Sequence, residues 1–375
     1  MIYQILIDRF NGGWATPPQN DITFLGGMLK GITDKLDYIQ SLGATAIWLS
    51  PFFANAENGY HGYHTVDYER IDPHFGTWKD LENLIDKAHA KNMKVIADFV
   101  PNHCHINHPF FQDALKRRKA SPYRNWFYFQ SDYSNKYVYF LQYRDLAKFN
   151  LENKAAAEYM IQVGERLSKA GMDGFRIDHA AGIPMDFLRS FRDRMHALNP
   201  ECRVFGEVWG FGVARKYYHT LRFKSPWHKL FYWIVGLKQE CLQLDYEGVM
   251  DGVLDFQVRN ILIEELKAGN RLRNNERLER KLKAHFDRYP SPDFKPYLFL
   301  DNHDTNRFLF YCHEDHTLLE EAIEVMKQCA QEYGLEYIIY YGTECAMTNR
   351  QTIENAEPYA DMRVREPMKW EKRRV

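Results

Sequence analysis

Short apolar runs recur along the chain, and longer stretches with helical spacing lie between several of them. The runs are rich in Val, Ile, Leu, Phe and Tyr, as strands buried on both faces should be. Eight such runs stand at 2–7, 45–50, 94–100, 173–178, 202–208, 252–256, 297–301 and 337–342. A strand followed by a helix, repeated in this way, predicts parallel pairing.

Helical patterns fill two of the early intervals, at 30–42, which Gly43 closes, and at 78–92. Eight strand and helix units predict an α/β fold that closes as a (β/α)8 TIM barrel, with an open doubly wound sheet as the alternative. No G-x-G-x-x-G follows a strand, and no Pro/Gly/Ser-rich linker divides the chain. After the last run we see no pattern for an eighth barrel helix, so this helix is expected to be missing.

The interval between the third and fourth runs is longer than one helix needs. Residues 104–150 are rich in aromatic and charged side chains and contain a β-like stretch at 136–143. We therefore expect a catalytic barrel of 1–103 and 151–375 that carries an inserted B-like subdomain, 104–150. Loops at the carboxyl ends of barrel strands build the sites of such enzymes, so the insert is expected beside the site.

Composition narrows the choice of partners. The chain has 375 residues, 49 Lys plus Arg against 50 Asp plus Glu, and 45% hydrophobic residues, so bulk charge does not favour nucleic acid. The apolar stretch 230–237 is too short to cross a bilayer, and no leader pattern follows Met1, so no membrane partner and a cytoplasmic location are expected. The six cysteines form no CxxC pair and are expected to be reduced structural thiols. The aromatic stretch 227–233 is expected to be core and not a sugar platform.

Charged residues follow four of the predicted strands. Because the carboxyl ends of parallel strands meet at one rim of a barrel, these side chains should converge. The set comprises Asp98, His103, Arg176, Asp178, Glu207, His303 and Asp304. Several carboxylates in one cleft repel each other, and such a cluster is usually offset by a cation or used to raise one pKa for acid chemistry.

Arg176 and Asp178 are two positions apart on one strand, so both point to the same face. Arg176 can hold Asp178 ionised as a nucleophile. Glu207 has Phe205, not Arg, two positions before it and could be the carboxyl with the raised pKa, that is, the general acid. Two carboxylates in different environments suit glycosidic bond cleavage, retaining if they lie ~5 to 5.5 Å apart and inverting if the gap is wider.

Motifs in order along nearly the whole chain resemble those of the α-amylase family, glycoside hydrolase family 13. They are "YQILIDRF", "LGATAIWLSPFF", "GYHGYHTVDYERIDPHFG", "DFVPNH", "GFRID", "GEVW", "LDNHD", "YYGTE" and "RVREPMKW". The resemblance implies a retaining glycoside hydrolase that cleaves α-glucosidic bonds, α-1,4 foremost, of malto-oligosaccharides or related α-glucans through a covalent intermediate. "LAKFN" at 146–150 is similar to the "MPKLN" signature of the neopullulanase and cyclomaltodextrinase branch.

The resemblance also implies a role for each site residue. Asp178 matches the nucleophile, Glu207 the acid/base, and Asp304 the third carboxylate, which binds sugar hydroxyls. The residues implied in substrate binding are Tyr63 as the stacking aromatic, His103 and His303 as hydrogen-bonding histidines, Arg176 as the partner arginine and Asp98 as a supporting carboxylate.

Two features depart from the family pattern. Typical amylases have Lys-His shortly after the nucleophile, where this chain has Ala181 and Gly182, which puts endo-acting starch binding and the amylase calcium site in doubt. Asn102 matches a calcium ligand of many members, and 8–21 resembles a calcium loop, although Asn11, Asn20 and Asp21 can equally satisfy a turn. No cofactor is expected to be required, no metal ligand is assigned, and calcium is allowed.

The second departure is the end of the chain, where the usual C-terminal β domain is not seen and the last strand is expected to be partly uncovered. Either a naturally short enzyme whose tail or homo-oligomer partner covers the gap, or a truncated product, would account for this. Two alternative functions remain open: a transglycosylase or isomerase that uses the same carboxylates, and a non-catalytic glucan-binding relative, against which the intact carboxylates argue.

Overall fold

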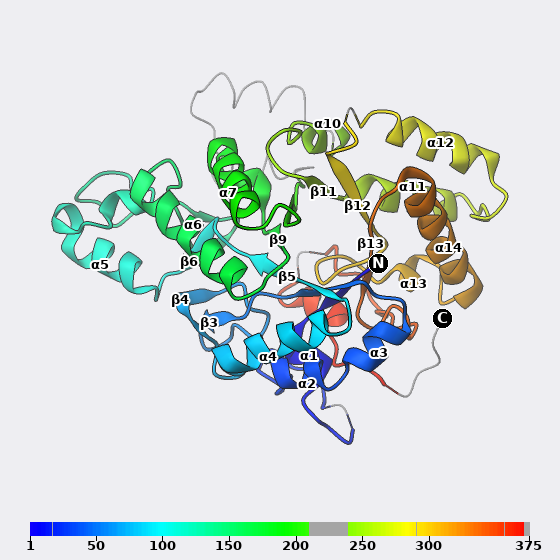
Figure 1. Cartoon of the computed structure of the whole chain (residues 1–375), viewed down its shortest axis with the longest axis horizontal. Helices are drawn as coiled ribbons and strands as arrows, with labels where there is room; N and C mark the ends of the chain where they lie inside the picture. Colours follow the sequence, from blue (N-terminus) through cyan, green and yellow to red (C-terminus); the bar gives the residue numbers. More distant parts are fainter. Residues whose placement is uncertain (17, 210–238, 290, 356, 371–375) are drawn as a thin grey trace. The chain divides into compact units, whose positions relative to one another are not determined.

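Eight parallel strands close into a barrel in the order β1-β13-β12-β11-β10-β9-β5-β2. This computed structural model describes all residues except 17, 210–238, 290, 356 and 371–375 (Figure 1). The barrel strands are β1 (Ile2–Ile5), β2 (Ala46–Leu49), β5 (Lys94–Phe99), β9 (Gly174–Ile177), β10 (Arg203–Gly206), β11 (Gly252–Asp255), β12 (Lys295–Phe299) and β13 (Tyr337–Tyr340). Each overlaps one predicted run, so the barrel prediction is confirmed.

The barrel strands are apolar on both faces because one face fills the interior and the other packs under helices. Every residue of β1, β2, β9 and β11 is buried. Each fully buried Val, Leu, Ile or Phe stabilises the fold by about 1.5–3 kcal/mol relative to an exposed one. This two-sided burial is why the runs show no alternation of polar and apolar residues.

Some helices begin at residues suited to capping. Thr77 and Asp80 form a capping box at the start of α4, which buries Leu81, Leu84, Ile85 and Ala88. The α-helices in the described residues are α1 (Ile7–Phe10), α2 (Leu29–Thr33), α3 (Leu36–Ser41), α4 (Trp78–His89), α5 (Pro109–Arg117), α6 (Lys154–Lys169), α7 (Met185–Leu198), α10 (Gln239–Leu244), α11 (Phe256–Lys267), α12 (Glu276–Phe286), α13 (Phe308–Tyr311) and α14 (His316–Tyr333). Short 3-10 helices are η1 (Arg118–Ala120), η2 (Arg124–Trp126), η3 (Ala180–Gly182) and η4 (Ala360–Val364).

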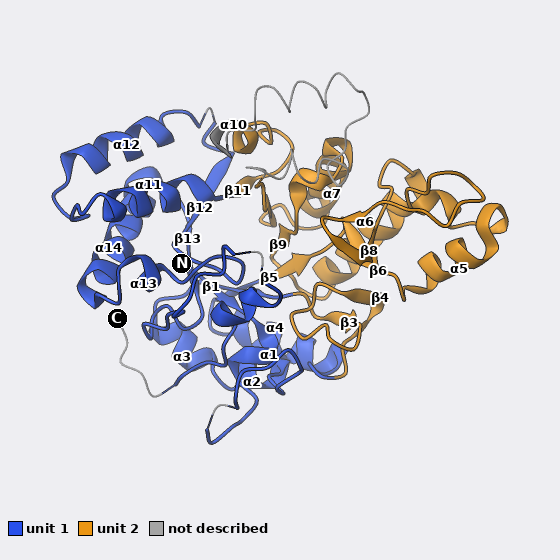
Figure 2. Cartoon of the chain, turned by 180° about the vertical axis from the view of Figure 1, so that it is seen from behind, with its two compact units in different colours: residues 1–50, 74–95, 254–375 blue, residues 51–73, 96–253 orange. Residues whose placement is uncertain are grey.

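The chain divides into two compact units (Figure 2). Unit 1 comprises Met1–Ser50, His74–Val95 and Leu254–Val375, and contains β1, β2, β12 and β13. Unit 2 comprises Pro51–Pro73 and Ile96–Val253, and contains β9, β10 and most of β5. Helices α6 and α7 of unit 2 pack against each other.

Two small antiparallel sheets of unit 2 lie outside the barrel order. Strands β3 (Phe53–Asn55) and β4 (Thr65–Ile71) pair with each other. Strands β6 (His103–His105), β8 (Tyr143–Lys148) and β7 (Tyr139–Phe140) form the second sheet. The second sheet and α5 fall in the segment predicted as the insert, while the boundaries 104–150 remain a prediction.

The helix predicted at 30–42 is two helices, α2 and α3, so that prediction is wrong in its continuity. A Cβ at Gly31 would lie 1.8 Å from the carbonyl oxygen of Asn11, so the first helix depends on glycine at this close approach. Lys35, between the two helices, has φ −112° and ψ 7°, which is not helical. Hydrophobic periodicity alone did not show this break.

After β13, the described residues up to Trp370 contain the 3-10 helix η4 and no α-helix, as expected from the pattern. The expectation that the last strand exposes apolar positions is wrong for these residues. Ile338, Ile339 and Tyr340 are buried, and Tyr337 is half-buried. Trp370 packs edge-on against Phe10, with ring centroids 5.0 Å apart, so the final described segment covers part of unit 1.

Five cysteines, Cys104, Cys202, Cys312, Cys329 and Cys345, are buried free thiols, as predicted. The side chain of Cys241 and the aromatic stretch 227–233 lie outside the described residues. No helix of the described part is both long and apolar enough to span a bilayer.

Candidate active site

The ends of β9 and β10 place two predicted catalytic carboxylates next to each other in unit 2. In the parallel register of these strands Arg176 pairs with Phe205 and Ile177 with Gly206. The next residues along the two strands are therefore Asp178 and Glu207. The backbone N–H of Glu207 donates to the carbonyl of Ile177 at 2.9 Å, which continues the ladder past both strand ends.

The Arg176 guanidinium is fully buried and joins three carboxylates. Its Nη1 lies 2.8 Å from Oδ1 of Asp98 and 2.9 Å from Oδ1 of Asp178, and its Nη2 lies 2.8 Å from Oε1 of Glu207. Burial alone would lower the pKa of Arg176, but Asp98 and Glu207 outweigh it and hold that pKa well above its usual value. The prediction that Arg176 and Asp178 share a face is confirmed.

Glu207 also has an arginine partner, which comes from the neighbouring strand. Phe205 does occupy the position two residues before Glu207, but Arg176 reaches Glu207 from the neighbouring strand. The contact with Asp178 has hydrogen-bond geometry, whereas the contact with Glu207 is an ion pair without it. Arg176 therefore contacts both carboxylates, and the two contacts differ in their geometry.

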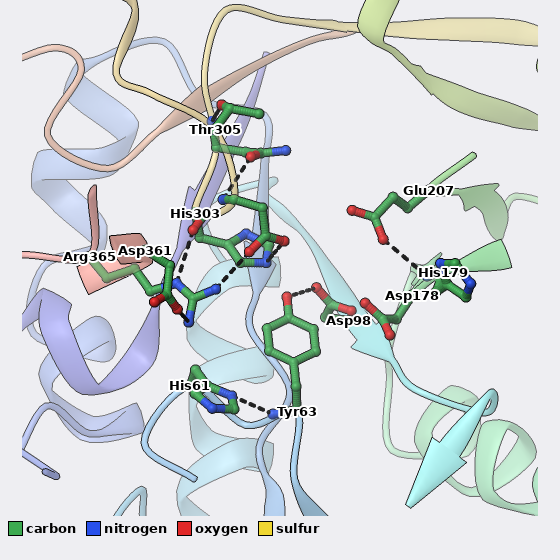
Figure 3. A network of polar contacts seen from close by, with 12 residues as sticks. His61, Tyr63, Asp98, Asp178, His179, Glu207, His303, Thr305, Asp361 and Arg365 are labelled. Atoms are coloured by element: carbon green, nitrogen blue, oxygen red, sulfur yellow. Dashed lines mark hydrogen bonds and ion pairs between the residues drawn. The ribbon is translucent and has the colours of Figure 1, made fainter. Parts of the chain in front are cut away.

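A backbone donor supplies the second contact of Glu207. His179, directly after the candidate nucleophile, donates its N–H to Oε2 of Glu207 at 3.0 Å (Figure 3). His179 has φ 40° and ψ 50°, a left-handed conformation that is uncommon for a residue with a side chain. This conformation turns the N–H of the nucleophile strand toward the carboxylate of the next strand.

Tyr63 and Asp98 extend the cluster within unit 2. The Tyr63 hydroxyl donates to Oδ2 of Asp98 at 2.8 Å (Figure 3), while Oδ1 of Asp98 faces Arg176. The Arg176 guanidinium carbon lies 6.0 Å from the centroid of the Tyr63 ring. Asp98 thus binds both the Arg176 guanidinium and the hydroxyl of the half-buried Tyr63 ring.

His103, from β6, is buried close by. Its ring stacks on Phe140, with centroids 4.6 Å apart, and its Nδ1 lies 3.2 Å from Nδ2 of Asn102. Burial above all, with contributions from His64 and Lys148, lowers the pKa of His103 to about 3. The imidazole is therefore neutral at physiological pH and can act as a hydrogen-bonding group without charge.

In unit 1, the loop after β12 carries the remaining predicted residues. His303 contacts Gln4 through Nδ1 at 2.8 Å, and its Nε2 lies 3.0 Å from Oδ2 of Asp304. Arg365 binds the other oxygen of Asp304 at 2.6 Å. Arg365 also donates through Nε to the His303 carbonyl at 2.9 Å (Figure 3). Asp304 is thus fixed through both carboxylate oxygens.

The carboxylates differ in access to solvent. The Asp304 side chain is 44% exposed, whereas those of Asp178 and Glu207 are 10% and 5% exposed. A buried pair beside a buried guanidinium suits bond-making and proton transfer, since its electrostatic interactions are strong in a water-poor setting. An exposed, doubly held carboxylate suits the binding of hydroxyl groups.

In the loop that resembles a calcium site, Asn11 and Asp21 make local contacts typical of turns, and Asn20 makes a long-range contact. Oδ1 of Asn11 accepts from the N–H of Gly13, Oδ1 of Asp21 accepts from the N–H of Ile22, and Nδ2 of Asn20 donates to the carbonyl of Met362. Within the described residues, no group of three or more His, Cys, Asp or Glu side chains is arranged to hold a metal ion. Calcium binding by this loop stays a prediction.

Four residues that interact with predicted site residues were not themselves predicted: His179 and Lys148 in unit 2, and Gln4 and Arg365 in unit 1. Arg365 lies within the "RVREPMKW" motif and Lys148 within "LAKFN", so both stood in stretches already recognised as resembling the family. Gln4 is a polar residue in an otherwise apolar strand, which is a usable signal. His179 acts through its backbone, and its side-chain identity gave no indication of this.

A comparison with known families matches residues 4–375 to the α-amylase catalytic domain. The chain belongs to the α-amylase family. It is 33% identical over 375 residues to "Alpha-amylase 2" of Dictyoglomus thermophilum, which covers 99% of this chain and 59% of that protein. It is 29% identical over 393 residues to "Neopullulanase 2" of Thermoactinomyces vulgaris, with 100% of this chain and 59% of that protein covered.

Among solved structures, the α-amylase of Geobacillus thermoleovorans in complex with acarbose superposes with a TM-score of 0.75 at 28% identity, covering 99% of this chain and 74% of that one. The chain spans about three-fifths of the length of the curated relatives it matches.

Proposed function

We propose that this chain is a retaining glycoside hydrolase that cleaves α-glucosidic bonds, α-1,4 foremost, of malto-oligosaccharides or related α-glucans. The observation that carries the proposal is the Arg176 cluster, in which a buried guanidinium holds Asp178, Glu207 and Asp98 at the ends of three barrel strands. Membership of the α-amylase family supports the substrate class.

In the proposed first step, Asp178 attacks the anomeric carbon and the bond from that carbon to the leaving oxygen breaks. Glu207 gives its proton to that oxygen, and the sugar is left on Asp178 as an ester. In the second step Glu207 takes a proton from water, the water oxygen attacks the anomeric carbon, and Asp178 is released as a carboxylate. Two inversions at one carbon retain its configuration.

The charge balance of the cluster favours a proton on one carboxyl before the reaction. Three ionised carboxylates around one guanidinium carry two negative charges in excess, and mutual repulsion favours protonation of one member of such a coupled group. Asp98 and Asp178 each have a hydrogen bond from Arg176 Nη1. In the proposed mechanism this proton resides on Glu207, which gives it to the leaving oxygen.

Asp304 is assigned to binding of the sugar hydroxyls, with His103 and His303 as hydrogen-bonding partners and Tyr63 as the stacking ring. These assignments are part of the proposal. Relatives named neopullulanase and cyclomaltodextrinase, together with the "LAKFN" stretch, favour small or cyclic α-glucans.

A cytoplasmic location is supported by the relative named "Intracellular maltogenic amylase" of Bacillus subtilis; a homo-oligomeric state stays a prediction.

Incubation with maltotriose, starch, cyclodextrin and pullulan, followed by NMR of the newly released anomer, tests this function. We expect the α-anomer to appear first, with the β-anomer growing only by mutarotation. Initial release of the β-anomer would contradict a retaining mechanism, and release of no sugar from any of the four would contradict the hydrolase.

A further inference from the structure

A buried lysine of the small antiparallel sheet contacts the segment that follows the candidate nucleophile. Lys148, the last residue of β8, is 3% exposed. Its Nζ donates to Oδ1 of Asn102 and to the carbonyl oxygen of Gly182, each at 2.5 Å. A lysine is almost never buried to this degree unless its charge is compensated by hydrogen-bond acceptors.

Asn102 is the residue that the family resemblance pairs with a calcium ligand. An amide oxygen and a backbone carbonyl are typical calcium ligands at about 2.3–2.6 Å. Lys148 Nζ lies at that distance from both oxygens. A calcium ion bound to the same two oxygens would overlap the ammonium group or lie against its charge, so the residues present do not fit calcium here.

The surroundings of Gly182 show why the carbonyl can approach the lysine. A Cβ on Gly182 would lie 2.6 Å from Cδ2 of His179 and 2.7 Å from Oδ1 of Asn102. Only glycine allows this turn, η3, to pack so closely on Asn102.

The charge of Lys148 also acts on two nearby histidines. Together with burial, which is the larger cause, it holds the pKa of His103 and of His179 below the usual value.

We propose that the ammonium group of Lys148 is a built-in cation that replaces calcium at Asn102, and that it positions the segment from Asp178 to Gly182. One end of that segment carries the nucleophile and the N–H that binds Glu207, and Lys148 holds the other end to Asn102. Lys148 is a positioning residue and does not touch the reacting atoms. Its effect on turnover rests on the proposed function; the claim about the cation does not.

The sharpest test converts the lysine site into a calcium site. The aspartate side chain of Lys148→Asp is shorter than lysine, and a calcium–oxygen bond of about 2.4 Å makes up most of the difference in length. A calcium ion bound to this aspartate would therefore lie near the present position of Nζ, in reach of the oxygens of Asn102 and Gly182. We expect calcium to raise the melting midpoint of Lys148→Asp and to raise its kcat by at least ~10-fold, with KM changing less. Calcium binding is measured directly by titration calorimetry on the same variant.

Lys136 is an exposed lysine of the same insert and provides the matched control. Lys136→Asp and the wild type should show no comparable gain with calcium, and wild-type activity should be unchanged by EDTA. Lys148→Met, which retains much of the shape without the charge, should lose at least ~10-fold in kcat and gain nothing from calcium.

A folded Lys148→Asp with no calcium response beyond that of the wild type would overturn the proposal. The proposal would also be overturned if the wild type responded to calcium as strongly as Lys148→Asp and this response were lost in Asn102→Leu. If Lys148→Asp does not fold, Lys148→Met decides, and a kcat within ~2-fold of the wild type would refute the positioning role. If no α-glucan is turned over, the proposed function fails, while calorimetry and melting still test the cation.

Discussion

The backbone N–H of His179 donates to the Glu207 carboxylate at 3.0 Å, although the two residues follow different barrel strands. The donor is the residue directly after Asp178, so the candidate nucleophile and the candidate acid/base are linked through a single peptide unit. A shift of the Asp178 strand end would therefore move Glu207 as well. This linkage requires the left-handed backbone of His179.

His179→Pro should lower kcat by at least ~100-fold, because proline has no N–H and fixes φ near −65°, far from the observed 40°. His179→Gly keeps the N–H and adopts positive φ without strain, so it should retain activity within ~10-fold of the wild type. Steady-state kinetics, with circular dichroism as the folding check, compares the two. Equal activity of both variants would show that the N–H to Glu207 is dispensable.

Arg176→Lys should reduce kcat by ~100-fold or more, because an ammonium group cannot reproduce the two-nitrogen fork that contacts three carboxylates. Arg189→Lys is the control, since Arg189 pairs with Asp186 on the helix surface and exposed pairs contribute little. Kinetics on maltotriose measures both variants. Near-wild-type turnover by Arg176→Lys would argue against the cluster as the centre of the site.

Glu207→Gln should lose ~100- to 10,000-fold in kcat on maltotriose, where the leaving oxygen needs a proton. On an aryl α-maltoside with an acidic phenol as leaving group, the first step should lose much less. Glu201→Gln is the control, because Glu201 is exposed and lies before the start of β10, and it should change neither rate. A uniform loss on both substrates would speak against Glu207 as the acid.

His108 links stability to pH, because burial lowers the pKa of this imidazole to about 4. In the unfolded chain the histidine binds a proton near pH 6.5, so between pH 6.5 and about 4 the unfolded state binds more protons than the folded state. The free energy of unfolding should therefore fall as pH falls through this range, by up to about 3 kcal/mol from this group.

His108→Asn should flatten this part of the pH dependence. His108 caps α5 by accepting from the N–H of Phe110, and asparagine can take over the cap without titrating. Urea unfolding at pH 7 and pH 4.5 measures the difference, with His89→Asn at an exposed position as the control. An unchanged difference between the two pH values in His108→Asn would contradict the assignment.

The barrel could be predicted because its strands are largely buried on both faces. Such strands appear in the sequence as short apolar runs. The pairing of Arg176 with Asp178 followed from the two-residue period of a strand. The contact from Arg176 to Glu207 depends on the register between β9 and β10, in which Arg176 faces Phe205. Register is a tertiary property, and one sequence did not supply it.

Other parts of the site were not predictable from residue types. The N–H of His179 depends on a backbone conformation that histidine rarely adopts. The burial of Lys148 depends on acceptors, Asn102 and Gly182, that are distant in the sequence. The side-chain pattern of "LAKFN" could equally belong to a strand with an exposed lysine.

The central claim is that Asp178 forms a covalent bond to the sugar. A 5-fluoro-α-glucosyl fluoride should inactivate the enzyme and leave one glycosyl unit on it, because the fluorine slows both steps and the fluoride leaves readily. Peptide mapping by mass spectrometry then locates the adduct. The account predicts the adduct on the peptide that contains Asp178 and none in Asp178→Asn, whereas an adduct on any other carboxylate, or turnover without an adduct, would contradict it.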